Sequence, residues 1–564
     1  MAGVFVIAAV LRVSFAIPGI WQQSWTPHQA DEHILPEEAL ALWEGVTPRE
    51  MGWPASTTRL GLSLVYAVPF MAEHGGELRR APNAEAALEI VSNYIAARWV
   101  DSRPLFLFGR WFCAFIGIAQ VVVMAWALSR WLPAPGAAIG TLCAATMPLL
   151  VLYSQFILSD VTGALFATAV LGLLPGATPG DDRRAMLLGL FVGLAAATKF
   201  HFGVWLFPAM AVWWISHGTS PIRRRLISSA VVGGTFLVVV LLLVPWTWTQ
   251  PVLMMKEFAG VVLVKAGGGA SLPQFGANAR LILIGLGWGV LLGLPAGVLA
   301  LARRHGWLGL SMIAVTFGSL ALLAASAIVF DRYALLVAPG AVLIAAAGWQ
   351  RAVDALPAAT GLLRSVAVAI VVGALLVQPV VALRRVAQVG SYHEAHAWML
   401  AHLPDKSHVV IYSEDNLFLP RASEQLETCA SGIWSTDAYA AKWATNGVNL
   451  SRPQVLPMRL AVLNDEFFRA FWCLRELNAP RPISFVVERF HQDPRFDTLN
   501  VETMVRQFND GLADPARGFD AVLVHFPIAT AVQPTRVFVS EVGPTLRLYL
   551  RPGLPLRGDS GIGR

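Results

Sequence analysis

The chain has 564 residues, of which 56% are hydrophobic and only 14% are charged, and its formal net charge at pH 7 is +6. An average soluble domain carries about 25% charged residues, so this composition excludes an ordinary soluble protein and indicates a polytopic membrane protein. The basic excess is mostly arginine in short loops, which orients membrane helices and does not indicate nucleic-acid binding. We therefore expect membrane lipids, and no nucleic acid, among its partners.

The first apolar segment, residues 1 to about 20, is long enough for a helix that crosses a bilayer. It lacks a basic start and a small-residue cleavage site, so we interpret it as an uncleaved span rather than a signal peptide. Residues 21–104 are too polar to span and are predicted to form a large first loop. Within this loop, 36–45 and 84–100 have helical patterns, and 58–72 is apolar enough to lie along a membrane surface.

Ten further apolar stretches follow the loop, which makes about eleven spans in all. They are predicted at about 105–130, 136–157, 160–177, 185–200, 202–216, 226–246, 280–302, 307–330, 333–350 and 365–384.

Arginines fall in alternate loops between these spans, namely Arg130, Arg183, Arg184, Arg223, Arg224, Arg225, Arg303, Arg304, Arg351 and Arg364. The positive-inside rule is satisfied if those loops are cytoplasmic, although Arg384 and Arg385 run against it. The 21–104 loop then faces away from the cytoplasm. An odd number of spans places the chain after the last span on that same side.

Residues 388–564 are less apolar than 1–387, and strand-like and helical patterns alternate in them. Strands are expected at 409–413, 459–463, 483–487, 521–525, 536–539 and 545–550, with helices at 392–403, 465–477 and 501–511. The predicted fold is therefore an α-helical membrane domain over 1–387, followed by an extracytoplasmic α/β domain over 388–564.

The segment directly after the first span reads Pro27-His28-Gln29-Ala30-Asp31-Glu32-His33. An acidic pair in an external loop is often only solvated, and that interpretation stays open here. The functional interpretation is a general base or a metal ligand at the membrane surface. It is favoured because the pair adjoins the end of a span and because a second acid recurs in a similar place.

That second acid is Asp160, which ends the sequence Tyr-Ser-Gln-Phe-Ile-Leu-Ser-Asp at the outer end of two predicted spans. An ionisable group beside an apolar region is costly and usually has a partner or a function. The alternative is that Ser159 or Asp160 simply caps the next helix.

Two later segments place cations at the outer ends of spans. Lys199 lies between two apolar runs, with His201 close behind it, and Arg332 and Tyr333 open a late span. These side chains could hold a phosphate, since arginine matches phosphate oxygens in a bidentate fork. The alternatives are a lysine that extends to the membrane interface, and an Asp331–Arg332 salt bridge beside an interface tyrosine.

Residues 247–279 form an external loop that contains Lys256, Lys265 and a glycine run at 267–269. This composition is typical of a mobile flap that closes over a substrate, and Lys256 could add a further cation to it. The alternative is a flexible loop with no such role.

Together these motifs resemble those of the GT-C glycosyltransferases, and the nearest branches look like the protein O-mannosyltransferases and the aminoarabinose transferase that modifies lipid A. The resemblance covers roughly 1–385 and rests on the order of its motifs, which here are Asp31-Glu32, Tyr153 to Asp160, Gly193-Leu194 with Thr198-Lys199, and Arg332-Tyr333. The late motif departs from the pattern because its proline, Pro339, comes late, and the span count is low for these branches.

The resemblance implies a polyprenyl-phosphate-sugar donor and an inverting single displacement onto an acceptor hydroxyl of a lipid, glycan or protein. By motif, Asp31 is the implied base, with Asp160 and Glu32 as further catalytic acids. Lys199, Arg332 and Tyr333 are implied to bind the donor phosphate, and His201 and Lys256 are added as candidates. Asp31, Asp160 and His33 are candidate ligands for a divalent metal ion, whose presence the sequence leaves open; no other cofactor is expected.

The expected protein is therefore a glycosyltransferase of a bacterial inner membrane, with its active site facing away from the cytoplasm. Sugar nucleotides are absent there, so a lipid must carry the donor sugar, and the departing phosphate needs fixed cations. The absence of an Asp-x-Asp triplet agrees with this. The main alternative is a multi-pass transporter or flippase, which predicts two related halves with interrupted helices. A receptor or scaffold is a further alternative.

Overall fold

The computed structural model divides by its internal contacts into two units. The first comprises Met1–Pro18, Ile34–Ala67 and Phe108–Arg384, and the second comprises Gly19–His33, Val68–Leu107 and Arg385–Arg564. The structure describes residues 2–13, 34–44, 54–100, 103–215, 220–266, 271–326, 331–355, 372–381, 408–412, 454–458, 485–490, 536–538 and 545–550.

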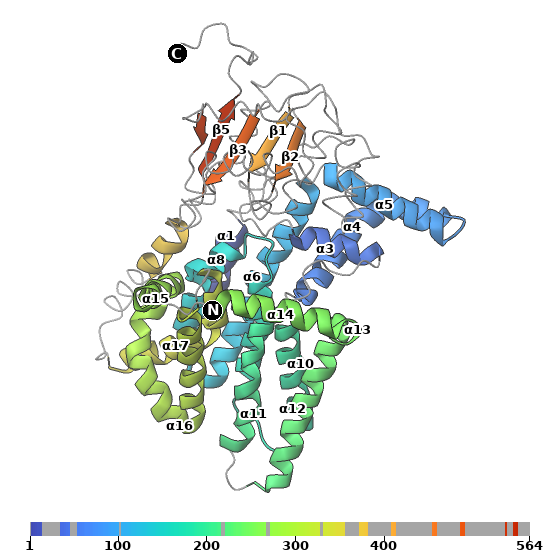
Figure 1. The fold of residues 1–564 in the computed structure, drawn as a ribbon. Helices are drawn as coiled ribbons and strands as arrows, with labels where there is room; N and C mark the ends of the chain where they lie inside the picture. The colour runs from blue at the N-terminus through green and yellow to red at the C-terminus, as the bar shows by residue number, and fades with distance from the viewer. Residues whose placement is uncertain are drawn as a thin grey trace. The chain divides into compact units, whose positions relative to one another are not determined.

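The first unit is built of helices (Figure 1). Their bounds are α1 Ala2–Val13, α3 Ile34–Ala41, η2 Leu42–Glu44, α4 Ser56–Arg80, α6 Arg103–Trp131, α7 Ala134–Thr146, α8 Pro148–Tyr153, α9 Asp160–Leu173, α10 Asp182–Thr198, η3 Phe200–Trp205, α11 Leu206–Ile215, α12 Ile222–Leu243, α13 Trp246–Thr249, α14 Pro251–Ala266, α15 Leu272–Leu286, α16 Trp288–Ala324, η4 Asp331–Leu336 and α17 Ala338–Ala355. A further helix spans Val372–Val381. Helices α4 and α6 each continue from one unit into the other.

Several of these helices are apolar enough to lie in a membrane. Among the described residues, three are also long enough to cross one: Pro104–Trp131, Ile222–Leu243 and Trp288–Ala324. Shorter apolar helices accompany them at Ala2–Val13, Ala134–Thr146, Asp160–Leu173, Phe200–Ile215 and Val372–Val381. The chain therefore has the helices of an integral membrane protein, while the number of about eleven spans stays a prediction.

Small residues let these helices approach one another closely. A β-carbon on Gly348 of α17 would collide with the carbonyl oxygen of Gly293 of α16, and one on Gly189 of α10 would collide with the carbonyl of Val232 of α12. Inside a bilayer the hydrophobic effect does not drive helices together. Glycine at such positions allows the backbones to come into van der Waals contact, which stabilises the packing. The α10–α12 pair is visible at the lower right of Figure 1.

Helix breaks occur where the sequence supplies proline or glycine. Met147 is extended (φ −61°, ψ 120°) before Pro148, so the predicted span 136–157 divides into α7 and α8. Gly287 has φ +80° and separates α15 from α16, inside the stretch predicted as one span at 280–302. Gly306 has φ +53° and interrupts α16 at the turn that was predicted from the positions of Arg303 and Arg304.

The described helices of the first loop follow the sequence pattern. The predicted helix at 36–45 corresponds to α3 and η2, and the apolar stretch 58–72 lies within α4. One side of α4 buries Leu62 and Tyr66, while Leu64 and Val68 are 72% and 68% exposed. Because both faces of this part of α4 are apolar, it suits a helix with protein on one side and lipid on the other.

The described parts of the second unit include the α4–α5 hairpin and a β-sheet. Helix α5 spans Ala84–Val100, as predicted. Phe70 of α4 packs edge-on to Tyr94 of α5 with ring centroids 5.0 Å apart, and His74 lies 5.6 Å from the same tyrosine ring. This aromatic cluster closes the hairpin.

The sheet has five strands in the order β2-β1-β3-β5-β4. They are β1 His408–Tyr412, β2 Gln454–Met458, β3 Phe485–Phe490, β4 Arg536–Phe538 and β5 Thr545–Leu550. Strands β1, β2 and β3 run parallel, and β5 is antiparallel to β3 and β4. Four of the predicted strands overlap β1, β3, β4 and β5, whereas 459–463, 521–525 and the three predicted helices lie outside the described residues.

Candidate active site

Asp160 and Lys199 form a buried ion pair in the first unit. The Lys199 Nζ donates to both carboxylate oxygens of Asp160 at 2.8 Å. Asp160 has no exposed surface and Lys199 is 6% exposed. Since each buried charge is matched by the other, the pair can persist in an apolar helical bundle where a single charge would be very costly.

The local backbone explains how the two side chains meet. Asp160 is the first residue of α9, which packs against α10. Lys199 ends α10 in an extended conformation (φ −154°, ψ 129°), and the chain then turns into the short helix η3. Ser159 occupies the N-cap position without a side-chain capping bond, and the Asp160 carboxylate faces the lysine.

Arg332 and Tyr333 approach this pair from η4, which packs against both α8 and α9. The Lys199 Nζ lies 5.6 Å from the centroid of the Tyr333 ring, in the range of a cation–π contact. Arg332 is 6% exposed and acts electrostatically on the Asp160 carboxylate. Two cations and one carboxylate therefore meet at the ends of apolar helices, and such a cluster can hold an anionic group.

His201 completes the described part of this cluster. Its ring stacks on Phe202 with centroids 4.9 Å apart and lies 5.7 Å from the Tyr333 ring. The structure thus brings together Asp160, Lys199, His201, Arg332 and Tyr333, five of the residues that the sequence selected.

The remaining selected residues are not brought into this cluster by any described contact. Asp31, Glu32 and His33 lie outside the described residues. Lys256 is on α14 and is exposed. Two residues further on, Phe258 packs edge-on to Phe200 with ring centroids 5.5 Å apart. Helix α14, which runs across α10 and α11 in Figure 1, is therefore attached beside Lys199, while the predicted mobility of the 247–279 loop stays a prediction.

Sequence reasoning missed a second buried ion pair close to Lys199. The Arg59 Nε of α4 lies 2.6 Å from a carboxylate oxygen of Glu38 on α3, and both side chains are buried. The Arg59 guanidinium also lies 5.6 Å from the Trp246 ring of α13. The available signal was a pair of charged residues within apolar stretches of the first loop.

Backbone and hydroxyl contacts attach the start of α4 to the residue before Lys199. The Ala55 amide donates to the Thr198 carbonyl oxygen at 2.9 Å. The hydroxyls of Thr57 and Thr198 also form a hydrogen bond. The first loop is thereby fixed to the end of α10 at the point where Lys199 turns toward Asp160.

The described residues do not supply a set of metal ligands. No group of three or more His, Cys, Asp and Glu side chains arranged to hold a metal ion is found among them. Of the three candidate ligands, Asp160 alone is described, and both of its oxygens accept from Lys199. A divalent ion at Asp160 would have to share these oxygens with a lysine cation, which is unlike an ordinary carboxylate metal site.

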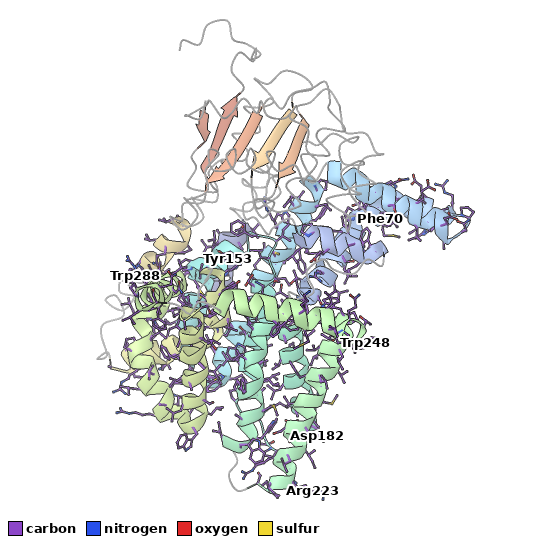
Figure 2. The ribbon with its side chains drawn as sticks, viewed as in Figure 1. Phe70, Tyr153, Asp182, Arg223, Trp248 and Trp288 are labelled. Atoms are coloured by element: carbon purple, nitrogen blue, oxygen red, sulfur yellow. The ribbon has the colours of Figure 1, made fainter. Side chains whose placement is uncertain are left out.

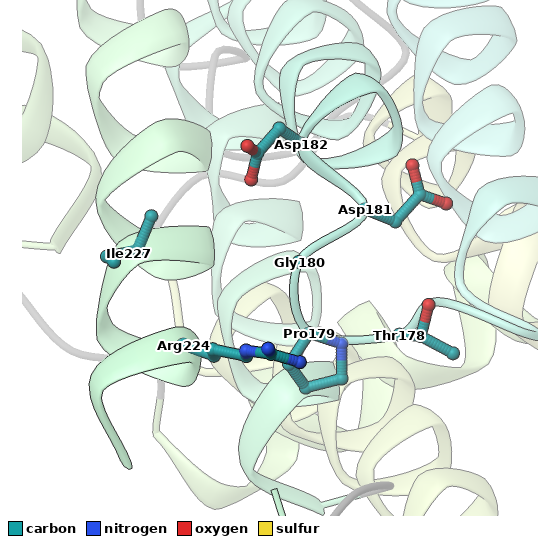
Figure 3. Close-up of a pocket in the computed structure, with 7 residues that line it drawn as sticks. All are labelled: Thr178, Pro179, Gly180, Asp181, Asp182, Arg224 and Ile227. Carbon is teal, nitrogen blue, oxygen red and sulfur yellow. The ribbon is translucent and has the colours of Figure 1, made fainter. Parts of the chain in front are cut away.

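An open hollow of about 590 Å³ lies at the other end of α10 (Figure 3). Its lining comprises Thr178, Pro179, Gly180, Asp181, Asp182, Arg224 and Ile227. Figure 2 shows Asp182 and Arg223 at this end of the helices, with Tyr153 at the opposite end. The 17 residues of α10 separate the hollow from Lys199 by about 25 Å, so the two are different sites.

Comparison with known proteins yields structural neighbours but no sequence relatives. No protein-family model matches the sequence, and no curated protein is similar to it. The structure is similar over most of the chain to the solved structures of AglB and ArnT.

The archaeal oligosaccharyltransferase AglB from Archaeoglobus fulgidus, in complex with an inhibitory peptide and a dolichol-phosphate, gives a TM-score of 0.49 at 12% identity, over 86% of this chain and 69% of AglB. ArnT from Cupriavidus metallidurans bound to undecaprenyl phosphate gives 0.49 at 13%, over 96% of this chain and 97% of ArnT. The Archaeoglobus fulgidus oligosaccharyltransferase in complex with Zn and sulfate gives 0.46 at 12%, over 86% and 68%.

Proposed function

We propose that this integral membrane protein is a glycosyltransferase that moves a sugar from a polyprenyl-phosphate donor to an acceptor hydroxyl. The acceptor belongs to a lipid, a glycan or a protein, and the reaction takes place on the extracytoplasmic face of a bacterial inner membrane. Residues 1–387 hold the reaction centre in this proposal, and residues 388–564 form an extracytoplasmic domain that helps to select the acceptor.

The observation that carries the proposal is the buried charge cluster around Asp160 and Lys199. It is assembled from three segments far apart in the sequence, at α9, the end of α10 and η4. A membrane bundle retains charges at such cost mainly where a substrate or ion uses them. Its cations suit a lipid-borne phosphate, which is the leaving group of the proposed reaction.

The proposed chemistry is a single displacement. The acceptor oxygen attacks the anomeric carbon of the donor sugar while the bond from that carbon to the phosphate oxygen breaks, so the configuration inverts. The acceptor proton passes to the carboxylate of Asp31, with Glu32 as the neighbouring alternative. The negative charge that develops on the departing polyprenyl phosphate is stabilised by Arg332 and Lys199, with a hydrogen bond from Tyr333.

Asp160 has a different role in this scheme from that of the base. Its two oxygens hold the Lys199 ammonium in place, and fixed cations stabilise developing charge better than mobile ones because they need no reorganisation. His201 and the exposed Lys256 are added as further contacts to the donor. A divalent ion at Asp31, Asp160 and His33 remains a prediction, and no step here depends on it.

The test is sugar transfer in membranes supplied with labelled polyprenyl-phosphate sugars. We expect Asp31→Asn to lower the transfer rate by about 10²–10⁴-fold while polyprenyl phosphate still binds, because a general base is lost and the cations remain. The matched control is Asp181→Asn at the far end of α10, which should transfer at the wild-type rate.

Full transfer by Asp31→Asn would move the base to Glu32 or Asp160. A wild-type protein that transfers sugar from none of the polyprenyl-phosphate donors would contradict the proposal and favour the transporter alternative. Deletion of 388–564 tests the tail separately, because unchanged transfer onto the native acceptor would contradict its role in acceptor selection.

A further inference from the structure

Arg12 is a charged residue inside the first apolar helix, and it is fully buried. Its Nη1 donates to the carbonyl oxygen of Ala8 at 3.2 Å and to that of Ala145 at 3.1 Å. Ala145 lies in the last turn of α7, where carbonyl groups lack helical partners and attract a cation. One end of the guanidinium is therefore satisfied by backbone oxygens.

The other edge of this guanidinium is not satisfied. Nε and Nη2 of Arg12 are sealed from solvent and have no hydrogen-bond partner in the part of the chain that the structure describes. These two nitrogens form the side edge of the guanidinium, whose parallel N–H groups match two oxygens of a phosphate or carboxylate. Burial of a cation with two unpaired donors is costly. A membrane protein retains such a residue mainly where an oxyanion binds it during function.

The residues around Arg12 belong to the segment that leads to Asp160. The Gln155 side-chain amide donates to the Arg12 carbonyl oxygen at 2.9 Å. On α6, a β-carbon added to Gly117 would lie 3.0 Å from both Arg12 Nε and Ser154 Oγ, so a glycine there leaves room for both groups. Arg12 is thereby fixed beside Ser154 and Gln155, which precede Asp160 in the chain.

Arg12 and Asp160 are separated by similar lengths of helix from one contact in the bundle. The Trp131 indole donates to the Leu171 carbonyl oxygen at 2.9 Å, so the end of α6 contacts the last turn of α9. Eleven residues lead from the start of α7 to Ala145, and eleven residues lead from Leu171 back to Asp160. Each path is about 16 Å long at 1.5 Å per residue.

We propose that Arg12 is an oxyanion-binding residue whose Nε and Nη2 bind phosphate oxygens of the lipid-linked substrate, in addition to the contacts of Lys199 and Arg332. The proposal rests on the proposed function and adds to it a binding contact from the first span. Since Nε and Nη2 are sealed from solvent, binding requires the contacts around them to open.

The experiment measures binding of polyprenyl phosphate, and of the uncharged polyprenol with the same chain, to the full-length protein in detergent. We expect Arg12→Met to bind polyprenyl phosphate about tenfold to a hundredfold more weakly, because a charge-assisted bidentate contact is lost. Polyprenol binding should not change. Arg12→Lys should recover part of the affinity, because it restores the charge without the fork.

Gln120→Leu is the matched control. Gln120 is equally buried, lies one turn after Gly117 on α6, and donates to the Thr168 hydroxyl at 2.7 Å. This variant perturbs the packing of the bundle without touching Arg12, so its affinity for polyprenyl phosphate should equal that of the wild type. Phosphatidylglycerol and inorganic phosphate serve as competitors that identify the source of the oxyanion.

The possible outcomes separate this inference from the proposed function. Wild-type affinity in Arg12→Met would overturn the inference and leave the proposed function standing. An equal loss of polyprenol and polyprenyl phosphate binding would overturn it in favour of a structural role. Competition by phosphatidylglycerol as strong as that by polyprenyl phosphate would overturn the assignment to the lipid-linked substrate. Failure of the wild type to bind polyprenyl phosphate would overturn both proposals.

Discussion

The two ends of α10 carry charges in opposite environments. At the C-terminal end, Lys199 is buried and both oxygens of Asp160 hold its ammonium. At the N-terminal end, Asp181 accepts from the Arg184 amide as an ordinary helix cap, and Arg224 beside it is exposed. Exposed charges are screened by water and contribute little, whereas buried charges are costly unless another charge matches them. Burial of the charges, and not their number, therefore distinguishes the candidate site from the exposed end of α10.

Removal of one charge of the buried pair should have the largest effect. Lys199→Met leaves Asp160 buried without its cation, and we expect a loss of about 3–5 kcal/mol in the free energy of unfolding. The double variant Asp160→Asn with Lys199→Met removes both charges and should recover most of that loss. Sugar transfer should be abolished in both variants, since neither holds a cation at this position. Chemical denaturation in detergent and the transfer assay measure the two effects.

A double variant as unstable as Lys199→Met would show that the ion pair does not account for the stability. Recovery of sugar transfer in the double variant would remove Lys199 from the proposed reaction.

The second buried ion pair extends the comparison to the first loop. Arg59→Met leaves Glu38 buried without its partner and removes the contact with Trp246, so we expect a loss of about 3 kcal/mol in unfolding free energy. Arg79→Met, at the exposed end of the same helix, should change it by less than about 0.5 kcal/mol. Equal effects of the two substitutions, measured by thermal or chemical unfolding, would contradict the attachment of the first loop through Arg59.

The contribution of Arg332 is tested by ligand affinity rather than by stability. We expect Arg332→Gln to weaken binding of polyprenyl phosphate by about tenfold to a hundredfold, because a charge-assisted hydrogen bond is lost. Arg332→Lys should retain part of the affinity. Arg351→Gln is the control, since Arg351 is exposed near the end of α17. The measurement is a binding titration, and undiminished affinity in Arg332→Gln would exclude it as a phosphate ligand.

The smallest effect is expected at the exposed end of α10. Arg224→Gln should change the free energy of unfolding by less than about 0.5 kcal/mol and leave sugar transfer unchanged, because an exposed side chain loses little on neutralisation. A large loss of transfer in this variant would show that the hollow at Asp181 and Arg224 takes part in function, and the contrast between the two ends would no longer hold.

Much of the described fold was predictable because it depends on local sequence. Apolar runs indicated the helices, and Arg303 and Arg304 indicated the turn between the predicted spans 280–302 and 307–330. Alternating patterns indicated four of the five strands. The errors fell where one residue redirects a helix, as at Pro148 and Gly287, because a break inside an apolar run changes the backbone without changing the hydropathy pattern.

The amino-acid composition and hydropathy pattern are enough to indicate a membrane protein, and the motifs select five candidate residues, namely Asp160, Lys199, His201, Arg332 and Tyr333. Helix packing brings these five residues together, pairs Asp160 with Lys199, and forms the second buried pair of Glu38 and Arg59. It also decided that Arg12 is buried with one edge unpaired. A charged residue in an apolar run marks a position where burial has a desolvation cost, and this can be seen in the sequence. Its partner is set by helix packing between residues far apart in the chain, which the sequence pattern does not show.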